Sequence, residues 1–240
     1  MKEVRYFYVP DATDNNELPE LEAHHAVKVL RMKTGDELFL MDGKGYFHKA
    51  IITLTTGKRC YYEITESIKQ DKTWNGKINL AIAPTKDIGR MEWMSEKITE
   101  IGFDSITFLD CDFSERKTLR NDRIEKIIVS AAKQSRKPLM PVSYGMASFR
   151  KFIERPFQGK TYICHCYDEI ERNDFMECLR HTATDDDITI LVGPEGDFST
   201  EEVRKAIEKG AVPVSLGKSR LRTETAGLMA VAISQMYKRN

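Results

Sequence analysis

The sequence lacks the features that mark several special classes of protein. Its longest apolar run, residues 226–233, falls far short of the roughly 20 residues that a membrane-spanning helix needs. The amino-terminal residues lack the apolar core of a secretory signal. Cysteine is scarce and odd in number, five in 240 residues, which argues against a disulfide framework and for reduced thiols. We therefore expect a cytoplasmic protein with no membrane partner.

The chain also has no net charge, because its 37 Lys and Arg residues balance its 37 Asp and Glu residues. This balance excludes a uniformly basic coat for nucleic acid but allows local patches, and residues 115–138 form one. The G-x-G-x-x-G and P-loop patterns are both absent, so neither a dinucleotide nor a nucleoside triphosphate is favoured. With 41% hydrophobic residues, the composition is that of a globular chain with one or two domains.

The first part of the chain is rich in strand patterns. β-Branched and aromatic residues gather in residues 6–9, 36–42, 45–55 and 60–68. One helix is expected at residues 19–32, before a stop signal at Gly35. The polar stretch 69–77 is typical of a linker. We therefore place a domain boundary there, with residues 1–70 on one side and residues 75–240 on the other.

The rest of the chain alternates short apolar runs with amphipathic stretches. Strands are expected near residues 78–83, 105–109, 141–145, 161–167, 187–193 and 212–217. Helices are expected near residues 87–101, 120–135, 147–154, 168–180, 200–209 and 223–237. This alternation is typical of a parallel sheet covered by helices, so the predicted fold class is α/β with a smaller β-rich domain in front.

The segment ITILVGPEGDFSTEEV combines a strand, a tight turn and a helix start. The strand runs into Gly193-Pro194-Glu195-Gly196, and Ser199 with Glu202 has the spacing of a capping box. Glycines in a turn at the carboxyl end of a parallel strand let a ligand approach backbone N–H and C=O groups. The same glycines could serve only to make the turn, and the pattern leaves both interpretations open.

A second loop, in VSLGKSRLRTETAGLMAVAI, is unusually basic. A strand ends at Leu216-Gly217, and Lys218, Arg220 and Arg222 follow before the next helix. Because helix starts favour acidic residues, these arginines indicate an anionic or electron-rich partner. A solvated basic loop is the alternative interpretation.

The cluster Cys164-His165-Cys166 suggests a metal site but is discounted. Consecutive residues of a strand alternate between its faces, and no second ligand cluster has the spacing to complete a zinc tetrahedron. The same geometry argues against a Cys-His nucleophile pair. We expect no bound metal.

Taken together, the motifs resemble one known family. The segments LVGPEGDFSTEE and LGKSRLRTETA, preceded by RYFYV, HHAVKVLRMKTGDEL and APTKDIGRMEWMSEKITEIG, are similar to the RsmE-like ribosomal RNA uracil N3-methyltransferases of the SPOUT superfamily. The resemblance extends from about Arg5 to the last helix. The motif GPEG alone is weak evidence for this family, whereas LG followed by R-x-L-R-x-E-T-A is highly specific for it. One departure is Asp197, where the family usually has a second glycine after GPEG.

The resemblance implies a fold and an activity. It implies a PUA-like β-barrel for RNA docking in residues 1–70, and a SPOUT methyltransferase domain in residues 75–240 whose carboxyl end forms a trefoil knot. It further implies S-adenosylmethionine-dependent methylation of N3 of a specific uridine in 16S ribosomal RNA, naked or in the small subunit, by a homodimer. The last helix would lie at the dimer interface or be buried within the chain. The implied cofactor-binding residues form two walls: Leu191, Gly193, Pro194, Glu195 and Gly196 in one, and Leu216, Gly217, Leu221, Arg222 and Thr225 in the other.

The implied reaction needs a proton acceptor and a stabiliser of negative charge. Glu195 and Glu224 are candidate bases for the uracil N3 proton, although Arg220 or Arg222 could hold Glu224 in an ion pair. Arg220 and Arg222 suit the electrostatic role, because the uracil anion is delocalised onto the ring oxygens. Basic residues suited to RNA phosphates are Arg5, Lys28, Arg31, Lys86, Arg90 and Arg136.

Two rival functions remain at this point. One is a catalytically silent RNA-binding protein that retains the fold, and Asp197 motivates it. The other is an unrelated α/β enzyme, without a knot, whose GPEG turn binds another nucleotide or an acyl group.

Overall fold

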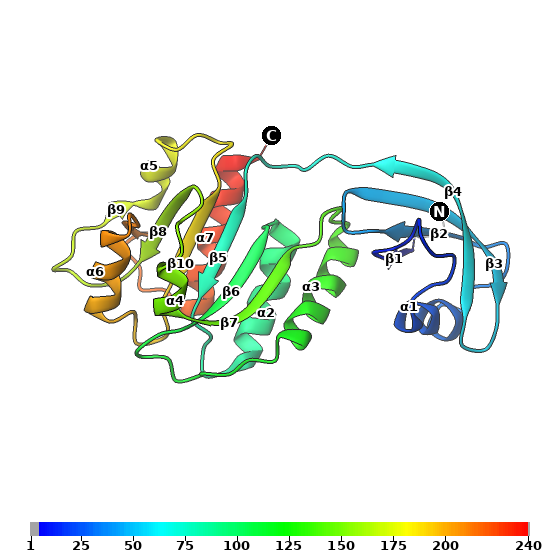
Figure 1. The fold of residues 1–240 in the computed structure, drawn as a ribbon, viewed down its shortest axis with the longest axis horizontal. Coiled ribbons are helices and arrows are strands. Elements are labelled where there is room, and N and C mark those ends of the chain that lie inside the picture. Colours follow the sequence, from blue (N-terminus) through cyan, green and yellow to red (C-terminus); the bar gives the residue numbers. More distant parts are fainter. Residues whose placement is uncertain (1–4, 240) are drawn as a thin grey trace. The chain divides into compact units, whose positions relative to one another are not determined.

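A computed structural model describes residues 5–239, and within them the chain divides into two compact units (Figure 1). The smaller unit contains the residues up to Lys72 together with Val129–Met140. The larger unit contains Thr73–Ile128 and the residues from Pro141 onward. Helix α3 (Asn121–Ser135) is therefore divided between the two units.

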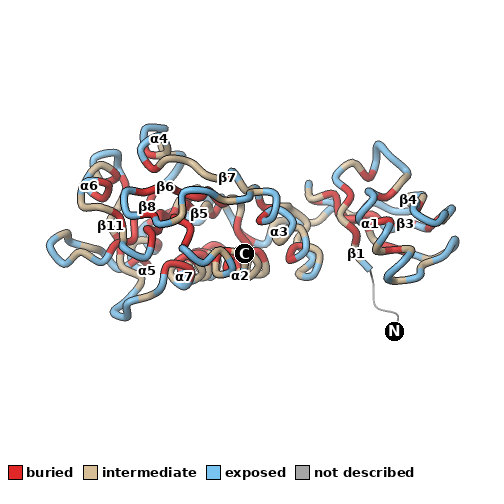
Figure 2. Tube along the Cα trace, turned by 90° about the horizontal axis from the view of Figure 1, so that it is seen from below, coloured by how far each residue is buried: buried red, intermediate tan, exposed pale blue. Residues whose placement is uncertain are grey.

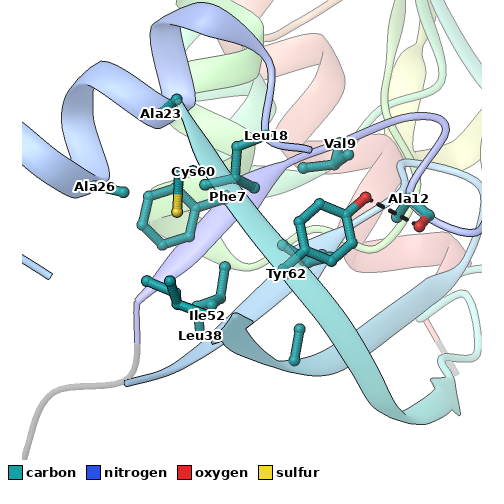
Figure 3. Close-up of a cluster of buried hydrophobic side chains, with 12 residues drawn as sticks. Phe7, Val9, Ala12, Leu18, Ala23, Ala26, Leu38, Ile52, Cys60 and Tyr62 are labelled. Atoms are coloured by element: carbon teal, nitrogen blue, oxygen red, sulfur yellow. Dashed lines mark hydrogen bonds between the residues drawn. The ribbon is translucent and has the colours of Figure 1, made fainter. Parts of the chain in front are cut away.

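The smaller unit is built on a four-stranded sheet. Its elements are β1 (Tyr6–Tyr8), α1 (Glu20–His24), the π-helical turn η1 (His25–Val29), β2 (Glu37–Met41), β3 (Tyr46–Thr55) and β4 (Cys60–Lys69). The sheet order is β1-β2-β3-β4, with β1 parallel to β2 and the other pairs antiparallel. Alternating apolar side chains of the strands, among them Phe7, Leu38 and Ile52, meet Ala23 and Ala26 of α1 and η1 in one core (Figure 3).

The helix expected at residues 19–32 is shorter and less regular than predicted. After α1 the helix widens into η1, and the N–H of Leu30 donates to the carbonyl of His25, five residues earlier. Arg31 then adopts a left-handed backbone with φ of 53°, which ends the helical turn before Gly35. The apolar spacing in this segment predicts a helix but does not reveal its change of pitch.

The larger unit is a seven-stranded sheet with helices on both faces. Its strands are β5 (Ile78–Ile82), β6 (Ser105–Asp110), β7 (Val142–Ser148), β8 (Lys160–Cys164), β9 (Asn173–Asp174), β10 (Ile188–Val192) and β11 (Val212–Ser215). Its helices are α2 (Ile88–Ile101), the first half of α3, α4 (Phe149–Ile153), α5 (Phe175–Arg180), α6 (Thr200–Glu208) and α7 (Thr223–Lys238). All pairs in the order β7-β6-β5-β10-β8-β11-β9 are parallel, as the alternation of elements predicts.

Helices cover the sheet in two layers (Figure 2). On one face, α4 and α6 pack on Leu191 of β10 and its neighbours in one buried cluster. On the other face, α7 approaches so closely that a Cβ on Gly227 would lie 2.8 Å from Ile82 Cδ1 and 2.9 Å from Met94 Sδ. The inner side of α7 is thus buried within the chain, while Met236 on its outer side is 61% exposed.

One expected helix, at residues 168–180, is mostly not helical. Only Phe175–Arg180 forms α5, because Asp174 caps its start by accepting the N–H of Glu177 at 3.1 Å. Residues 168–170 form a turn and a bend instead, Arg172 donates back to the carbonyl of His165 at 2.9 Å, and Asn173 pairs with β11. These tertiary contacts override the local helical pattern.

Candidate functional site

A cavity of about 830 Å³ lies in the larger unit where three neighbouring strands, β8, β10 and β11, end. Its volume falls in the range of sites that hold small organic ligands. Three chain segments supply most of its lining: residues 164–168 at the end of β8, residues 192–197 at the end of β10, and residues 214–221 with Thr223 at the end of β11. The carboxyl ends of parallel strands are where open α/β sheets bind ligands.

The first wall is the loop of residues 193–198, and it is packed tightly on itself. Gly193 is required because a Cβ there would lie 2.8 Å from the backbone nitrogen of Phe198. Phe198 is fully buried, and its carbonyl accepts the hydroxyl of Tyr167 at 2.6 Å. The capping box expected at Ser199 and Glu202 is present and starts α6. This wall is therefore held in one conformation by the protein itself.

Asp197 completes that wall and explains the departure from the family pattern. Its backbone φ of 69° is left-handed, a conformation that favours glycine and that Asp and Asn tolerate better than most other residues. Its carboxylate accepts the N–H of Cys166 and that of Phe198, both at 2.7 Å. Asp197 therefore replaces the freedom of a glycine with two hydrogen bonds, one of which ties the β10 loop to the end of β8.

Glu195, a predicted base and cofactor residue, lines the cavity and is exposed to solvent. Its Oε1 accepts the N–H of Lys86 at 2.9 Å. The carbonyl of Lys86 in turn accepts the guanidinium of Arg116 at 2.6 Å. The residues that follow β5 thereby fix the direction of this carboxylate.

The second wall, the loop of residues 216–222, is largely open. Leu216, Gly217, Arg220 and Leu221 line the cavity. Gly217 has a left-handed φ of 125°, and a Cβ built on it would have no atom within 4 Å. The exposed side chains of Lys218, Arg220 and Arg222 make no hydrogen bond or ion pair with another described residue.

The end of β8 forms a third wall that the sequence motifs do not reveal. Cys164, His165 and Cys166 all line the cavity, because β8 ends at Cys164 and the strict alternation of faces ends with it. Burial raises the pKa of Cys164 to about 12, so its thiol is not a nucleophile near neutral pH. Among the described residues, no group of three or more His, Cys, Asp or Glu side chains is placed to hold a metal ion.

His165 is the most unusual polar group in this wall. It is only 4% exposed, and neither ring nitrogen has a hydrogen-bond partner within the described chain. Burial lowers the pKa of His165, opposed by the nearby carboxylates of Asp197 and Glu169 and assisted by Arg172. The ring is therefore neutral near pH 7.

The remaining predicted site residues lie outside the lining of the cavity. Leu191 is fully buried in the core against α4 and α6. Arg222 occupies the position just before α7, and Thr225 is exposed in the first turn of that helix. Glu224 is 7% exposed and faces Arg90 at 3.7 Å, so its ion-pair partner is Arg90 rather than Arg220 or Arg222.

The predicted RNA-binding residues fall in both units, and the smaller unit contains Arg5, Lys28, Arg31 and Arg136. All four side chains are exposed. Arg136 lies over the ring of Tyr6 at 5.2 Å, and it shares with Arg31 a left-handed φ of 53°. Among residues 5–239, the only other non-glycine residue with a positive φ is Asp197. In the larger unit, Lys86 pairs with Glu115 at 2.9 Å, and Arg90 is the partner of Glu224.

The sheet, the cavity at its carboxyl edge and the glycine-bearing loops define an α/β protein with a cavity of the size that suits a compact organic ligand. The sequence model described as an RNA methyltransferase domain matches residues 72–235, and the one described as an RNA methyltransferase PUA domain matches residues 18–65. The chain belongs to the RNA methyltransferase family. The predicted α/β fold with a PUA-like amino-terminal domain is thereby confirmed, while the trefoil knot stays a prediction.

Solved structures agree with this assignment. A probable rRNA methyltransferase from Porphyromonas gingivalis is 40% identical, with a TM-score of 0.90 and 98% of each chain covered. A ribosomal RNA small subunit methyltransferase E from Neisseria gonorrhoeae, bound to S-adenosylmethionine, is 28% identical, with a TM-score of 0.84 and 98% of each chain covered. A curated relative from Synechocystis with the same enzyme name is 28% identical over 90% of this chain and 71% of its own length.

No helix in the described part of the chain is long and apolar enough to cross a membrane.

Proposed function

We propose that this protein transfers the methyl group of S-adenosylmethionine to N3 of a uridine in the 16S RNA of the small ribosomal subunit. The observation that carries the proposal is the cavity, which brings the two motif loops to one site in a chain of the RNA methyltransferase family. The names of the relatives supply the substrate class, and the donor bound in the Neisseria structure supplies the cofactor.

The residues of the cavity fit such a donor. Gly217 leaves open space where any other residue would place a Cβ, and the unpartnered ring of His165 offers hydrogen bonds to a ligand. The loop of residues 193–198 and the loop of residues 216–222 would hold the donor between them. When bound, S-adenosylmethionine supplies a methyl group on a sulfonium that already is a good leaving group. The protein's contribution is then mainly to hold donor and acceptor in line.

The uracil N3 proton must be removed, and we assign its acceptor to Glu195 rather than Glu224. Glu195 lines the cavity and is held by the N–H of Lys86. Glu224 lies outside the lining and faces Arg90. Arg220 lines the opposite wall, and we assign it to stabilise the negative charge that develops on the uracil oxygens. Arg222 precedes α7 on the same loop and is assigned to the flanking phosphate.

We assign RNA docking to residues 1–70 and catalysis to residues 75–240. The match of a PUA domain to residues 18–65 and the exposed cations Arg5, Lys28 and Arg31 support the first assignment. A homodimer and a cytoplasmic location remain predictions. The exposed side chain of Met236 on α7 would suit a dimer interface. The silent RNA-binding alternative is not favoured, because relatives over the whole chain are methyltransferases and Asp197 fits the loop without blocking it.

The test is mass mapping of 16S RNA from a strain that lacks the gene. Purified protein and S-adenosylmethionine are added to its small subunits and, separately, to its naked RNA. We expect one uridine to gain a methyl group at N3, and Arg222→Ala to restore it at least tenfold more slowly. Arg180→Ala serves as the matched control, since Arg180 is exposed and pairs with Glu177 on α5 away from the cavity. No new methyl group with either substrate would contradict the proposal.

A further inference from the structure

His165 is a buried side chain whose hydrogen-bonding capacity the protein leaves unused. It directly follows β8, lines the cavity and is 4% exposed. Neither Nδ1 nor Nε2 has a partner among the described residues. Buried polar groups almost always have partners, because an unpaired one costs about 1–3 kcal/mol.

The polar groups around His165 are already engaged with one another. The carboxylate of Asp197 accepts two backbone N–H groups, those of Cys166 and Phe198. The hydroxyl of Tyr167 donates to the carbonyl of Phe198, although its ring lies only 6.0 Å from the imidazole. The guanidinium of Arg172 donates to the carbonyl of His165 and to Asp168, and not to the imidazole. The missing partner of the ring therefore has to come from the cavity.

The other buried histidine provides a contrast. His48, in the smaller unit, is 2% exposed, and its Nδ1 lies 2.8 Å from the hydroxyl of Ser67. Its Nε2 has no hydrogen-bond partner among the described residues but lies 3.9 Å from a carboxylate oxygen of Asp42. This buried histidine thus has one hydrogen-bonded ring nitrogen and a carboxylate near the other. His165 has no hydrogen-bonded ring nitrogen within the described chain and borders a cavity.

The state of the ring selects the kind of ligand group. Because its pKa is lowered by burial, the imidazole is neutral and presents one N–H donor and one acceptor. This pair complements a hydroxyl or the edge of a nucleobase, each of which can both donate and accept. It suits a phosphate or a carboxylate poorly, since those groups only accept when ionised.

We propose that His165 hydrogen-bonds a nucleoside bound in the cavity, through a ribose hydroxyl or the edge of a base. This inference rests on the proposed function, in which two nucleosides reach the site: the adenosine part of the donor and the target uridine. It adds a ligand-binding residue on the β8 wall that neither motif loop contains.

The test compares His165→Phe with wild type. Phenylalanine retains a ring of similar size and removes both hydrogen-bonding atoms. Calorimetric titration of the full chain with S-adenosylmethionine, and separately with S-adenosylhomocysteine, measures the donor side without requiring catalysis. Steady-state methylation of small subunits measures KM for the RNA. His181→Phe is the matched control, because His181 is exposed after α5 and does not line the cavity.

For His165→Phe we expect either the affinity for the donor to fall, or KM for the RNA to rise, by about tenfold or more. Weaker donor affinity assigns the hydrogen bond to adenosine, and a raised KM for RNA with unchanged donor affinity assigns it to the uridine. The melting temperature of the unliganded His165→Phe variant should be unchanged or higher, because an unsatisfied buried group has been removed. His165→Gln, which keeps a donor and an acceptor, should recover part of the affinity.

Two results would overturn the inference. The first is equal donor affinity and equal KM for RNA in wild type and His165→Phe. The second is a lower melting temperature of the unliganded variant, seen again with His165→Leu, while affinity and KM stay unchanged. That second result would mean that the histidine has a structural role. If the wild type itself bound no donor, the proposed function would fail, an outcome distinct from a failure of the inference on His165.

Discussion

The two motif loops of the cavity are built in opposite ways. The loop of residues 193–198 is fixed by the close packing of Gly193 on Phe198, by two hydrogen bonds to Asp197 and by the hydroxyl of Tyr167. The loop of residues 216–222 is mostly exposed. The hydrogen bonds of its described residues are those between Ser215 and Gly217 and the one that the carbonyl of Arg222 accepts from the N–H of Ala226. One wall is thus fixed by contacts within the protein, while the other has few such contacts.

This difference suggests a division of labour. A preformed wall binds without the cost of ordering, so substitutions in it should affect stability and donor affinity together. An exposed, basic wall with few contacts to the rest of the protein can meet donor and RNA, so substitutions in it should affect catalysis with little effect on stability. Both tryptophans, Trp74 and Trp93, lie in the larger unit, so their fluorescence in urea reports the unfolding of that unit alone.

The largest effect is expected for Gly193→Ala. The added Cβ would lie 2.8 Å from the backbone nitrogen of Phe198, so the loop must shift. We expect a loss of about 3 kcal/mol in the unfolding free energy of the larger unit, and donor binding weakened more than tenfold. Gly196→Ala is the control for stability, because Gly196 lies in the same unit, a Cβ there would make only an ordinary contact at 3.4 Å with Phe113 Cβ, and its φ is not left-handed. Equal stability of the two variants would show that the first wall is not tightly packed.

Asp197→Ala should lower the unfolding free energy of the larger unit by less, about 2 kcal/mol. It removes two hydrogen bonds and places alanine at a left-handed φ. Asp197→Gly removes the same bonds but fits the backbone, so it should be the more stable variant of the two. Urea unfolding of both variants separates the side-chain contribution from the backbone contribution. Identical losses would mean that the left-handed conformation costs nothing at this position.

Tyr167→Phe should lower the unfolding free energy by about 1 kcal/mol, because the carbonyl of Phe198 loses its hydroxyl donor. Donor affinity should fall by a few fold at most, since the ring stays in place. Calorimetry with S-adenosylmethionine and urea unfolding measure the two effects. A larger effect on donor affinity than on stability would indicate that Tyr167 contacts the ligand directly and does not only support the wall.

Arg220→Ala should leave the unfolding free energy within about 0.5 kcal/mol of wild type, since this exposed side chain on the second wall has no described partner. Methylation of small subunits should nevertheless slow at least tenfold, with donor affinity little changed. Single-turnover assays at saturating donor isolate that step. A strongly destabilised variant would contradict the picture of an open second wall.

The smallest effect is a pH dependence of stability. Because the folded-state pKa of His165 lies below its ordinary value, the unfolded chain takes up a proton first as pH falls below about 6.5. The contribution of the neutral ring to stability is therefore present above that pH and lost as pH falls through the folded-state pKa. Urea unfolding at pH 7.5 and 5.5 should show a smaller difference for His165→Phe than for wild type. An unchanged difference would mean that the ring is not protected from protonation.

The sequence predicts the α/β architecture and both motif loops because each is a contiguous strand, turn and helix start. It misses the β8 wall, because His165 and Cys166 reach the cavity only through the strand order β10-β8-β11, which no periodicity contains. A signal was present nonetheless, since the apolar run TYIC ends in polar residues at the same edge as the other two strands. Leu191 illustrates the converse, because its motif position suggests a cavity wall while the pleat of β10 directs it into the core.

Asp197 shows what sequence reasoning could not decide. Compared with the family pattern, Asp197 adds a carboxylate and a Cβ where a glycine is usual, and the sequence alone does not show how the loop accommodates them. Its left-handed φ and its bonds to Cys166 and Phe198 instead make it part of the support of the first wall. That role depends on a contact between residues 31 positions apart, which appears only after the chain has folded.

The most direct test of the account is a crystal structure of this protein with S-adenosylmethionine. We predict the donor in the cavity at the ends of β8, β10 and β11, in contact with both motif loops, and the loop of residues 216–222 more ordered than without it. A donor found at any other place, or one that touches only one of the two loops, would contradict the account.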